Sequence, residues 1–249
     1  MRVSIVTAVK NGAAVIGETL RSIETQNYPL IEHVVIDGAS TDATREIVLR
    51  EGKRVAVMRS ALDRGVYDAF NSGLAATSGE LIGFLNAGDT YHSAQSIEHI
   101  VAAFDDPEVD AVFGNLVITD PEHPERILRH YRADGFKPEA LTMGMMPPHP
   151  TLFLRRRVYD TFGGYDPQYV IAGDFDLCLR IFLKGRIKFR HIPETLVRMP
   201  AGGLSNRGWR SIVANTREIH SACAANGVPT SWLRLMVRLP LKWLHGRSD

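Results

Sequence analysis

The chain carries only two cysteines, Cys178 and Cys223, among its 249 residues. Two cysteines form no disulfide framework and show no metal-ligand spacing, so we interpret both as reduced core residues of a cytoplasmic protein. No apolar run approaches the roughly 20 residues that span a bilayer. The opening stretch MRVSIVTAVKNG is not expected to be a signal peptide, because its apolar part is short and contains Ser4 and Thr7.

An excess of one charge is also lacking, since 29 basic and 28 acidic residues leave a formal net charge of +1. This balance gives no overall field that would attract a polyanion, so we expect no nucleic-acid partner. Hydrophobic residues make up 45% of the chain and charged residues 23%, which is typical of a globular protein. A chain of this length builds one large domain, or one domain with an appendage.

The sequence has no glycine-rich phosphate loop. The turn after the first expected strand reads TAVKNGAAVIG, which contains neither G-x-G-x-x-G nor a Walker A sequence. This argues against a dinucleotide-dependent oxidoreductase and against ATP or GTP hydrolysis by a P-loop.

What the sequence does have is an alternation of strands and helices over about its first 115 residues. Apolar, β-branched runs predict strands over residues 3–9, 32–38, 54–60, 80–87 and 110–120. Helical spacing or capping residues predict helices between them, over residues 13–23, 39–52, 67–79 and 97–104. This alternation predicts an α/β fold with a mostly parallel sheet and helices on both faces.

After residue 120 the pattern loosens into two Pro-rich connectors, DPEHPER and MMPPHPT. Beyond them we expect a strand, a short helix and a Gly turn within 151–166, and a helix within 173–185. An extended segment over 187–200 and a helix over 209–226 follow.

Polar side chains lie at or just past the carboxyl ends of three predicted strands: Thr7, Asp37 and Asp89. The carboxyl ends of parallel strands meet at one edge of a sheet, where ligands bind in such folds. Asp37 is either a turn residue or an acceptor for a ribose hydroxyl or a base N–H. Asp89 ends the small-residue stretch NAGD, which is either ordinary turn chemistry or a metal ligand.

Three ordered blocks carry a family resemblance. They are VSIVTAVKNGAAVIGETLRSIETQNYPLIEHVVIDGASTDAT, DRGVYDAFNSGLAATSGELIGFLNAGD and AGDFDLCLRIFLKG. They closely resemble inverting family 2 glycosyltransferases of the GT-A fold, most of all the small bacterial enzymes of capsule, exopolysaccharide and glycolipid assembly. The resemblance covers nearly the whole chain up to about residue 206.

The resemblance implies a GT-A fold with a Rossmann-like central sheet, followed by C-terminal helices. The catalytic domain is expected over 1–206, with a nucleotide-binding half over about 1–115 and an acceptor half over about 116–206. A helical extension is expected over 207–249.

The resemblance also assigns roles to residues. Asp174 is implied as the catalytic base and Asp89 as the metal ligand. The nucleotide-sugar donor is expected to contact Thr7, Asn11, Asp37, Asp63, Arg64, Gly65, Asn86 and Ala87. His149 matches a segment near the acceptor, and Ser205 lies in a GGLS segment that matches one near the donor pyrophosphate.

Plainer interpretations stand beside these roles. Asp174 and Asp176 also suit the N-terminal dipole of a helix, and Asp63 and Arg64 also suit a simple turn. Tyr67 and other apolar residues of its helix are expected to be core residues rather than a sugar platform.

In one place the sequence departs from the family's D-x-D metal motif, because Asn86 or Ala87 stands where an acid is usual. The metal, Mn²⁺ or Mg²⁺, would have one firm protein carboxylate and would share the donor's diphosphate and waters. We therefore expect weak metal binding without donor. The cation would stabilise the leaving diphosphate, and Asp174 would deprotonate the acceptor hydroxyl, which gives single displacement with inversion.

Residues 231–247 place Arg234, Arg238 and Lys242 on one side of a helix, with Trp232 and other apolar residues over much of the remainder. This segment either binds an anionic membrane surface or packs on the domain. The expected function is sugar transfer to a saccharide or lipid-linked acceptor, in a cytoplasmic protein with possible contact at the inner face of the cell membrane. The alternatives are a sugar-nucleotidyltransferase and a non-catalytic module that binds a nucleotide sugar.

Overall fold

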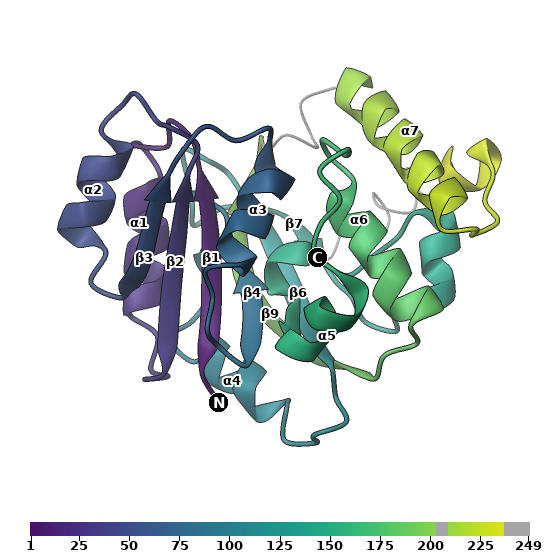
Figure 1. The fold of residues 1–249 in the computed structure, drawn as a ribbon, viewed down its shortest axis with the longest axis horizontal. Coiled ribbons are helices and arrows are strands. Elements are labelled where there is room, and N and C mark those ends of the chain that lie inside the picture. Colours follow the sequence, from purple (N-terminus) through teal and green to yellow (C-terminus); the bar gives the residue numbers. More distant parts are fainter. Residues whose placement is uncertain (203–208, 237–249) are drawn as a thin grey trace.

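The computed structural model describes residues 1–202 and 209–236 (Figure 1). These residues build a nine-stranded sheet with the strand order β3-β2-β1-β4-β8-β6-β9-β5, and β7 pairs with β6. Helices cover both faces of the sheet (Figure 1).

The first half of the sheet is entirely parallel. β1 pairs with β2 on one side and β4 on the other, and β2 pairs with β3. The strands are β1 (Val3–Val9), β2 (Ile31–Asp37), β3 (Val55–Ser60) and β4 (Leu81–Phe84). The helices between them are α1 (Ile16–Glu24), α2 (Thr44–Glu51) and α3 (Val66–Leu74). The predicted alternation is thus confirmed, although β4 ends earlier than predicted.

The second half mixes both directions. β8 pairs antiparallel with β4 and β6, β6 pairs parallel with β9, and the short β5 pairs antiparallel with β9. Its strands are β5 (Thr90–Tyr91), β6 (Ala111–Thr119), β7 (Ile127–Tyr131), β8 (Phe153–Arg155) and β9 (Phe189–Pro200). Its helices are α4 (Ser96–Ala102), α5 (Arg156–Phe162), α6 (Gly173–Cys178) and α7 (Trp209–Ala225), with short 3₁₀ turns η1 (Pro138–Met143) and η2 (His149–Thr151) and a π-helical continuation of α6, η3 (Leu179–Lys184). The sequence did not predict β5, β7 or η1.

Alternation along the strands explains the two covered faces. Val6 of β1 belongs to the same core cluster as Phe70 of α3, whereas its neighbour Ile5 belongs to the cluster of Ile97 in α4. Successive side chains of a strand point to opposite faces, so one apolar strand serves both layers of helices.

Helix α7 packs against the same core cluster as α6. Ile219, Ala222 and Cys223 lie in one buried cluster with Phe175 of α6. Cys223 and Cys178 are both buried and unbridged, as predicted. The domain boundary predicted at residue 206 lies outside the described residues. Within the described ranges, no helix has the length and apolar character that crossing a bilayer requires.

Candidate active site

One cleft of about 960 Å³ opens at the carboxyl ends of β1 and β4. Its walls come from the turn after β1, the loop before α3, the turn after β4, η2, the loop before α6 and the end of β9. The cleft brings together most of the residues that the sequence analysis singles out: Asn11, Asp63, Arg64, Gly65, Asn86, Ala87, Asp89, His149 and Asp174. The two acids Asp89 and Asp174 therefore face a common space, although they come from distant parts of the chain.

At the rim of the cleft, hydrogen bonds join the loop after β1, which contains Asn11, to the loop after β2. The backbone N–H of Asn11 donates to Ser40 Oγ over 2.8 Å, and the N–H of Thr41 donates to Asn11 Oδ1 over 2.9 Å. Asn11 and Ala39 both have positive φ, 49° and 56°, a region that non-glycine residues seldom occupy. Such conformations persist where the surroundings hold them, and they gather at functional sites.

Thr7 and Asp37, which were expected to contact the nucleotide, do not line the cleft. Both are fully buried, and their side chains bond inside the protein. Thr7 Oγ1 lies 2.9 Å from His33 Nε2, and Asp37 accepts from the N–H of Ser40 and, over 2.6 Å, from the hydroxyl of Ser60. The cleft begins one residue beyond Thr7, at Ala8 and Val9 near the end of β1. Asp37 does not line the cleft itself, but its bond to Ser40 holds the loop that forms the rim.

The loop before α3 meets the end of β2 at Gly38. A Cβ atom at Gly38 would lie 2.5 Å from Asp63 Oδ2 and 3.3 Å from Lys10 Cβ, so a larger residue here would displace the carboxylate of Asp63. Asp63 Oδ1 accepts from the N–H of Gly65 over 3.1 Å, and Arg64 pairs with Asp68 at 3.0 Å. Asp63 and Arg64 thus make the local contacts of a turn, as the simpler interpretation expects, and they also line the cleft.

The turn after β4 presents two oxygen-bearing side chains to the cleft. Asp89 is 6% exposed, and burial raises the pKa of its carboxyl to about 7, against a smaller opposing effect of a hydrogen bond from the backbone of Asn86. Asn86 Oδ1 is buried and has no hydrogen-bond partner among the described residues. The turn itself is fixed by Thr19 of α1, whose hydroxyl donates to the carbonyl of Asp89 and accepts from the N–H of Gly88.

These two oxygens fit a divalent cation. Carboxylate and amide oxygens are ligands that Mg²⁺ and Mn²⁺ accept, and a cation would favour the charged form that burial of Asp89 disfavours. Among the described residues, no cluster of three His, Cys, Asp or Glu side chains forms a complete metal cage.

Asp174, at the start of α6, is held from two sides. The hydroxyl of Tyr67 in α3 lies 3.2 Å from Asp174 Oδ1 and 2.6 Å from the carbonyl of Ile171, and the N–H of Phe175 donates to Oδ1 over 2.8 Å. Gly173 allows this approach, because a Cβ there would lie 2.8 Å from the ring of Tyr67. Tyr67 is a core residue, as expected from the sequence, but its hydroxyl also positions the carboxylate.

Helix α7 fixes the loop before Asp174. Three successive backbone N–H groups, of Val170, Ile171 and Ala172, donate to the carboxylate of Glu218 in α7, the latter two over 2.8 Å. Val170 and Ile171 also line the cleft. Because the bonded carboxylate is charged, these bonds are stronger than neutral ones, and α7 thereby sets the shape of the cleft wall.

His149 lies on the cleft wall and contacts the rings of Phe70, Phe84 and Tyr165. Its Nε2 is 2.7 Å from the hydroxyl of Tyr165, and its ring stacks on Phe70 with centroids 5.6 Å apart. Burial lowers the pKa of His149, while the charge of Asp174 acts in the opposite direction. The side chain is therefore a rigid, neutral part of the wall near Asp174.

Ser205 lies outside the described residues. Sequence reasoning missed three residues of this site: Lys10, which lines the cleft, Tyr67 as a partner of Asp174, and Glu218. Lys10 was visible as the single cation in the loop after the first strand. Tyr67 and Glu218 act through contacts between distant segments, for which the sequence carries no local signal.

Comparison with known families gives a match over residues 4–162 to the family described as Glycosyl transferase family 2. Among characterised sequences, PGL/p-HBAD biosynthesis glycosyltransferases of Mycobacterium bovis and Mycobacterium tuberculosis are 30% identical to this chain over 210 residues. That match covers 82% of this chain and 78% of theirs.

Solved structures share the fold at low sequence identity. TarS of S. aureus (1–349, in complex with UDP-GlcNAc) superposes with a TM-score of 0.68 at 16% identity, covering 89% of this chain and 66% of that one. The mannosyltransferase PcManGT from Pyrobaculum calidifontis, in complex with GDP-Man and Mn²⁺, gives 0.65 at 19% identity and covers 98% and 80%.

Replacing Glu218 with alanine is expected to free the loop before Asp174. Loss of a charged acceptor shared by three N–H groups costs about 1–3 kcal/mol locally, so the amides of residues 170–172 should exchange roughly 5–100 times faster with solvent deuterium. Arg217→Ala, at the exposed neighbouring position, is the control. Unchanged protection of these amides in Glu218→Ala would contradict the assignment.

The buried pair of Thr7 and His33 makes folding sensitive to acid. Burial lowers the pKa of His33 from 6.5 to about 3. Below pH 6.5 the unfolded chain binds a proton that the folded one does not, so the free energy of unfolding should fall by up to about 1.4 kcal/mol per pH unit. Urea unfolding between pH 7.5 and 4.5 should show a shallower fall for His33→Gln than for wild type or His123→Gln, an exposed histidine. Parallel pH profiles for all three proteins would refute this.

Proposed function

The chain belongs to glycosyltransferase family 2, and from this premise we propose how its cleft performs sugar transfer. The protein is a sugar-transferring enzyme with the GT-A fold. We infer that the cleft binds a nucleotide-sugar donor and that the sugar moves, with inversion, to a hydroxyl of a saccharide or lipid-linked acceptor in surface polysaccharide or glycolipid assembly. The single observation that carries this proposal is the common cleft of Asp89 and Asp174.

The donor end lies at the turn after β4 and the rim after β1. Asn11, Lys10 and Asp63 surround the space where the nucleotide would lie, and Lys10 offers a positive charge for its phosphates. Asp89 and Asn86 would hold Mn²⁺ or Mg²⁺, which when bound stabilises the negative charge that develops on the departing diphosphate. A solved relative in fold, PcManGT, contains GDP-Man and Mn²⁺, which supports this metal class.

The acceptor end lies at Asp174. Its carboxylate would take the proton of the attacking hydroxyl while the oxygen forms the new bond to the anomeric carbon and the bond to the diphosphate breaks. Tyr67 and the N–H of Phe175 keep one carboxylate oxygen oriented, which leaves Oδ2 for the acceptor. His149 would form the neutral wall beside the acceptor.

Two carboxylate variants separate the roles. Asp174→Asn should lower kcat about 10²–10⁴-fold, the usual contribution of a general base, while metal-dependent donor binding persists. Asp89→Asn should abolish the thermal stabilisation that donor and Mn²⁺ give together, because a ligand raises stability only as far as it binds the folded state. A panel of nucleotide sugars with Mn²⁺ or Mg²⁺, scored for nucleoside-diphosphate release and melting temperature, measures both.

Asp160→Asn, an exposed position on α5, is the matched control. Full turnover in Asp174→Asn with donor binding intact would favour a non-catalytic binding module. Release of pyrophosphate from a nucleoside triphosphate and a sugar phosphate would favour a sugar-nucleotidyltransferase. Absence of turnover and of stabilisation with every nucleotide sugar would end the donor-site assignment.

We also propose that the segment 231–247 makes peripheral contact with an anionic membrane. Its described part supports this, because Trp232, Leu233 and Met236 are exposed while Leu235 is buried in the core. Residues 231–236 thus pack on the domain through Leu235 and leave apolar side chains exposed, with exposed Arg234 among them. Residues 237–249 lie outside the described residues.

Removing that apolar surface should release the protein from vesicles. In co-sedimentation with phosphatidylglycerol-containing vesicles, Leu233→Ser/Met236→Ser should weaken partitioning about tenfold or more, because each buried apolar side chain contributes about 1.5–3 kcal/mol. Leu49→Ser, at an exposed leucine on α2, should behave as wild type. Equal sedimentation of all three proteins would exclude this contact.

A further inference from the structure

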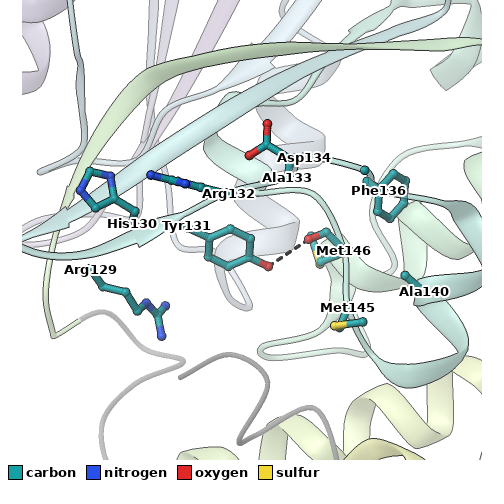
Figure 2. A pocket seen from close by; sticks show the side chains of 11 residues that line it. Arg129, His130, Tyr131, Arg132, Ala133, Asp134, Phe136, Ala140, Met145 and Met146 are labelled. Carbon is teal, nitrogen blue, oxygen red and sulfur yellow. Dashed lines mark hydrogen bonds between the residues drawn. The ribbon is translucent and has the colours of Figure 1, made fainter. Parts of the chain in front are cut away.

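A second cavity, of about 250 Å³, lies between the end of β7, the loop that follows it and η1 (Figure 2). It shares no lining residue with the cleft of Asp89 and Asp174. One part of its wall is basic, with Arg129, His130 and Arg132. We refer to it as the β7 pocket.

The basic wall of the β7 pocket is not neutralised from within the described residues. Neither Arg129 nor Arg132 forms an ion pair in that part of the chain, and the guanidinium of Arg129 lies over the ring of Tyr131 at 5.9 Å. The acid of the wall, Asp134, lies 3.9 Å from a ring nitrogen of His191. The lining thus holds two arginines and one aspartate, and this excess of positive charge favours an anionic ligand with phosphate or carboxylate oxygens.

The opposite wall is apolar. Phe136, Ala140, Met145 and Met146 contribute it, and the hydroxyl of Tyr131 donates to the carbonyl of Met146 over 2.9 Å to hold the two walls together (Figure 2). Methionine side chains adapt to irregular apolar ligands. The pocket thus combines an anion-binding side with an apolar side, as an amphipathic molecule with a charged head requires.

The sheet ties this pocket to the cleft. Arg129 of β7 pairs with Ile118 of β6, which pairs with Met199 of β9, and Met199 lines the cleft. Two strand spacings, roughly 10 Å, separate the backbone of Arg129 from that of Met199. Along the chain, Met146 precedes His149 of the cleft wall by three positions. The strands β7, β6 and β9 and the segment from Met146 to His149 thus connect the pocket with the wall of the cleft.

The other side of the pocket adjoins the exposed apolar end of the described chain. Thr230 Oγ1 donates over 2.7 Å to the carbonyl of Thr142 in η1, the turn that also supplies Ala140 to the pocket. Trp232, Leu233 and Met236, all exposed, follow directly. An apolar tail that leaves the pocket past η1 would meet this surface.

We propose that the β7 pocket binds the anionic head of an amphipathic acceptor, whose apolar tail passes over Met145 and Met146 toward residues 232–236. This inference rests on the proposed function, since it names the chemical class of the acceptor. The head is anchored by Arg129 and Arg132, and the sugar or hydroxyl to be extended lies at Asp174.

The test uses decyl phosphate below its micelle concentration, measured by isothermal titration calorimetry on the full chain. Decyl phosphate should bind, decyl glucoside and inorganic phosphate should bind at least roughly tenfold more weakly, and affinity should rise from hexyl to decyl phosphate. Arg129→Gln/Arg132→Gln should weaken decyl phosphate roughly tenfold or more. The control Arg45→Gln/Arg59→Gln, which removes the same charge at exposed positions, should stay within about twofold of wild type.

Absence of decyl phosphate binding, or equal binding by both double variants, would overturn the proposal. Equal affinity for inorganic and decyl phosphate would overturn it as well, since it would leave only an anion site. Donor stabilisation by nucleotide sugar and Mn²⁺ should be unchanged in Arg129→Gln/Arg132→Gln. Decyl phosphate binding in a protein that binds no nucleotide sugar would defeat the proposed function and leave the pocket standing.

Discussion

The central position of β1 between two parallel partners is the constraint on which this protein's site depends. Because β2 and β4 both run parallel to β1, all three strands end at the same edge of the sheet. The turns after β1 and β4 then lie on one cleft, with Asn11 on one and Asp89 on the other. Strain at the rim, in the positive φ of Asn11 and Ala39, is held by hydrogen bonds between the two turns that follow β1 and β2.

The second acid reaches this cleft by a different route. Asp174 comes from the mixed half of the sheet, and its position depends on Tyr67 from α3 and on Glu218 from α7. The two acids of the cleft are thus positioned by different parts of the fold, Asp89 by the parallel βα units and Asp174 by packing between helices.

Much of this architecture follows from the sequence, because continuous β-branched runs and helical spacing are strong local signals. β7 escaped prediction because its residues, with exposed Ile127 and Leu128 followed by Arg129 and His130, lack the pattern of a half-buried strand. Motif position placed Asp89 and Asp174 on one cleft correctly. Thr7 lies behind the cleft wall, because its hydroxyl bonds to buried His33, a contact between distant segments that motif position does not reveal. Tyr67 shows what composition does not reveal, because an aromatic residue can pack in the core and still bond to Asp174 through its hydroxyl.

The hydrogen bonds between Glu218 and the loop before Asp174 have a consequence for the order in which the newly made chain folds. A ribosome makes the chain from its N-terminus, and domains fold as their segments emerge. All strands of the sheet have been made once β9 is complete, but the three amides of residues 170–172 find their acceptor only after α7 has followed. The nascent chain therefore passes through a stage in which the sheet edge with Asn11 and Asp89 can form while the cleft wall before Asp174 still lacks the carboxylate that fixes it.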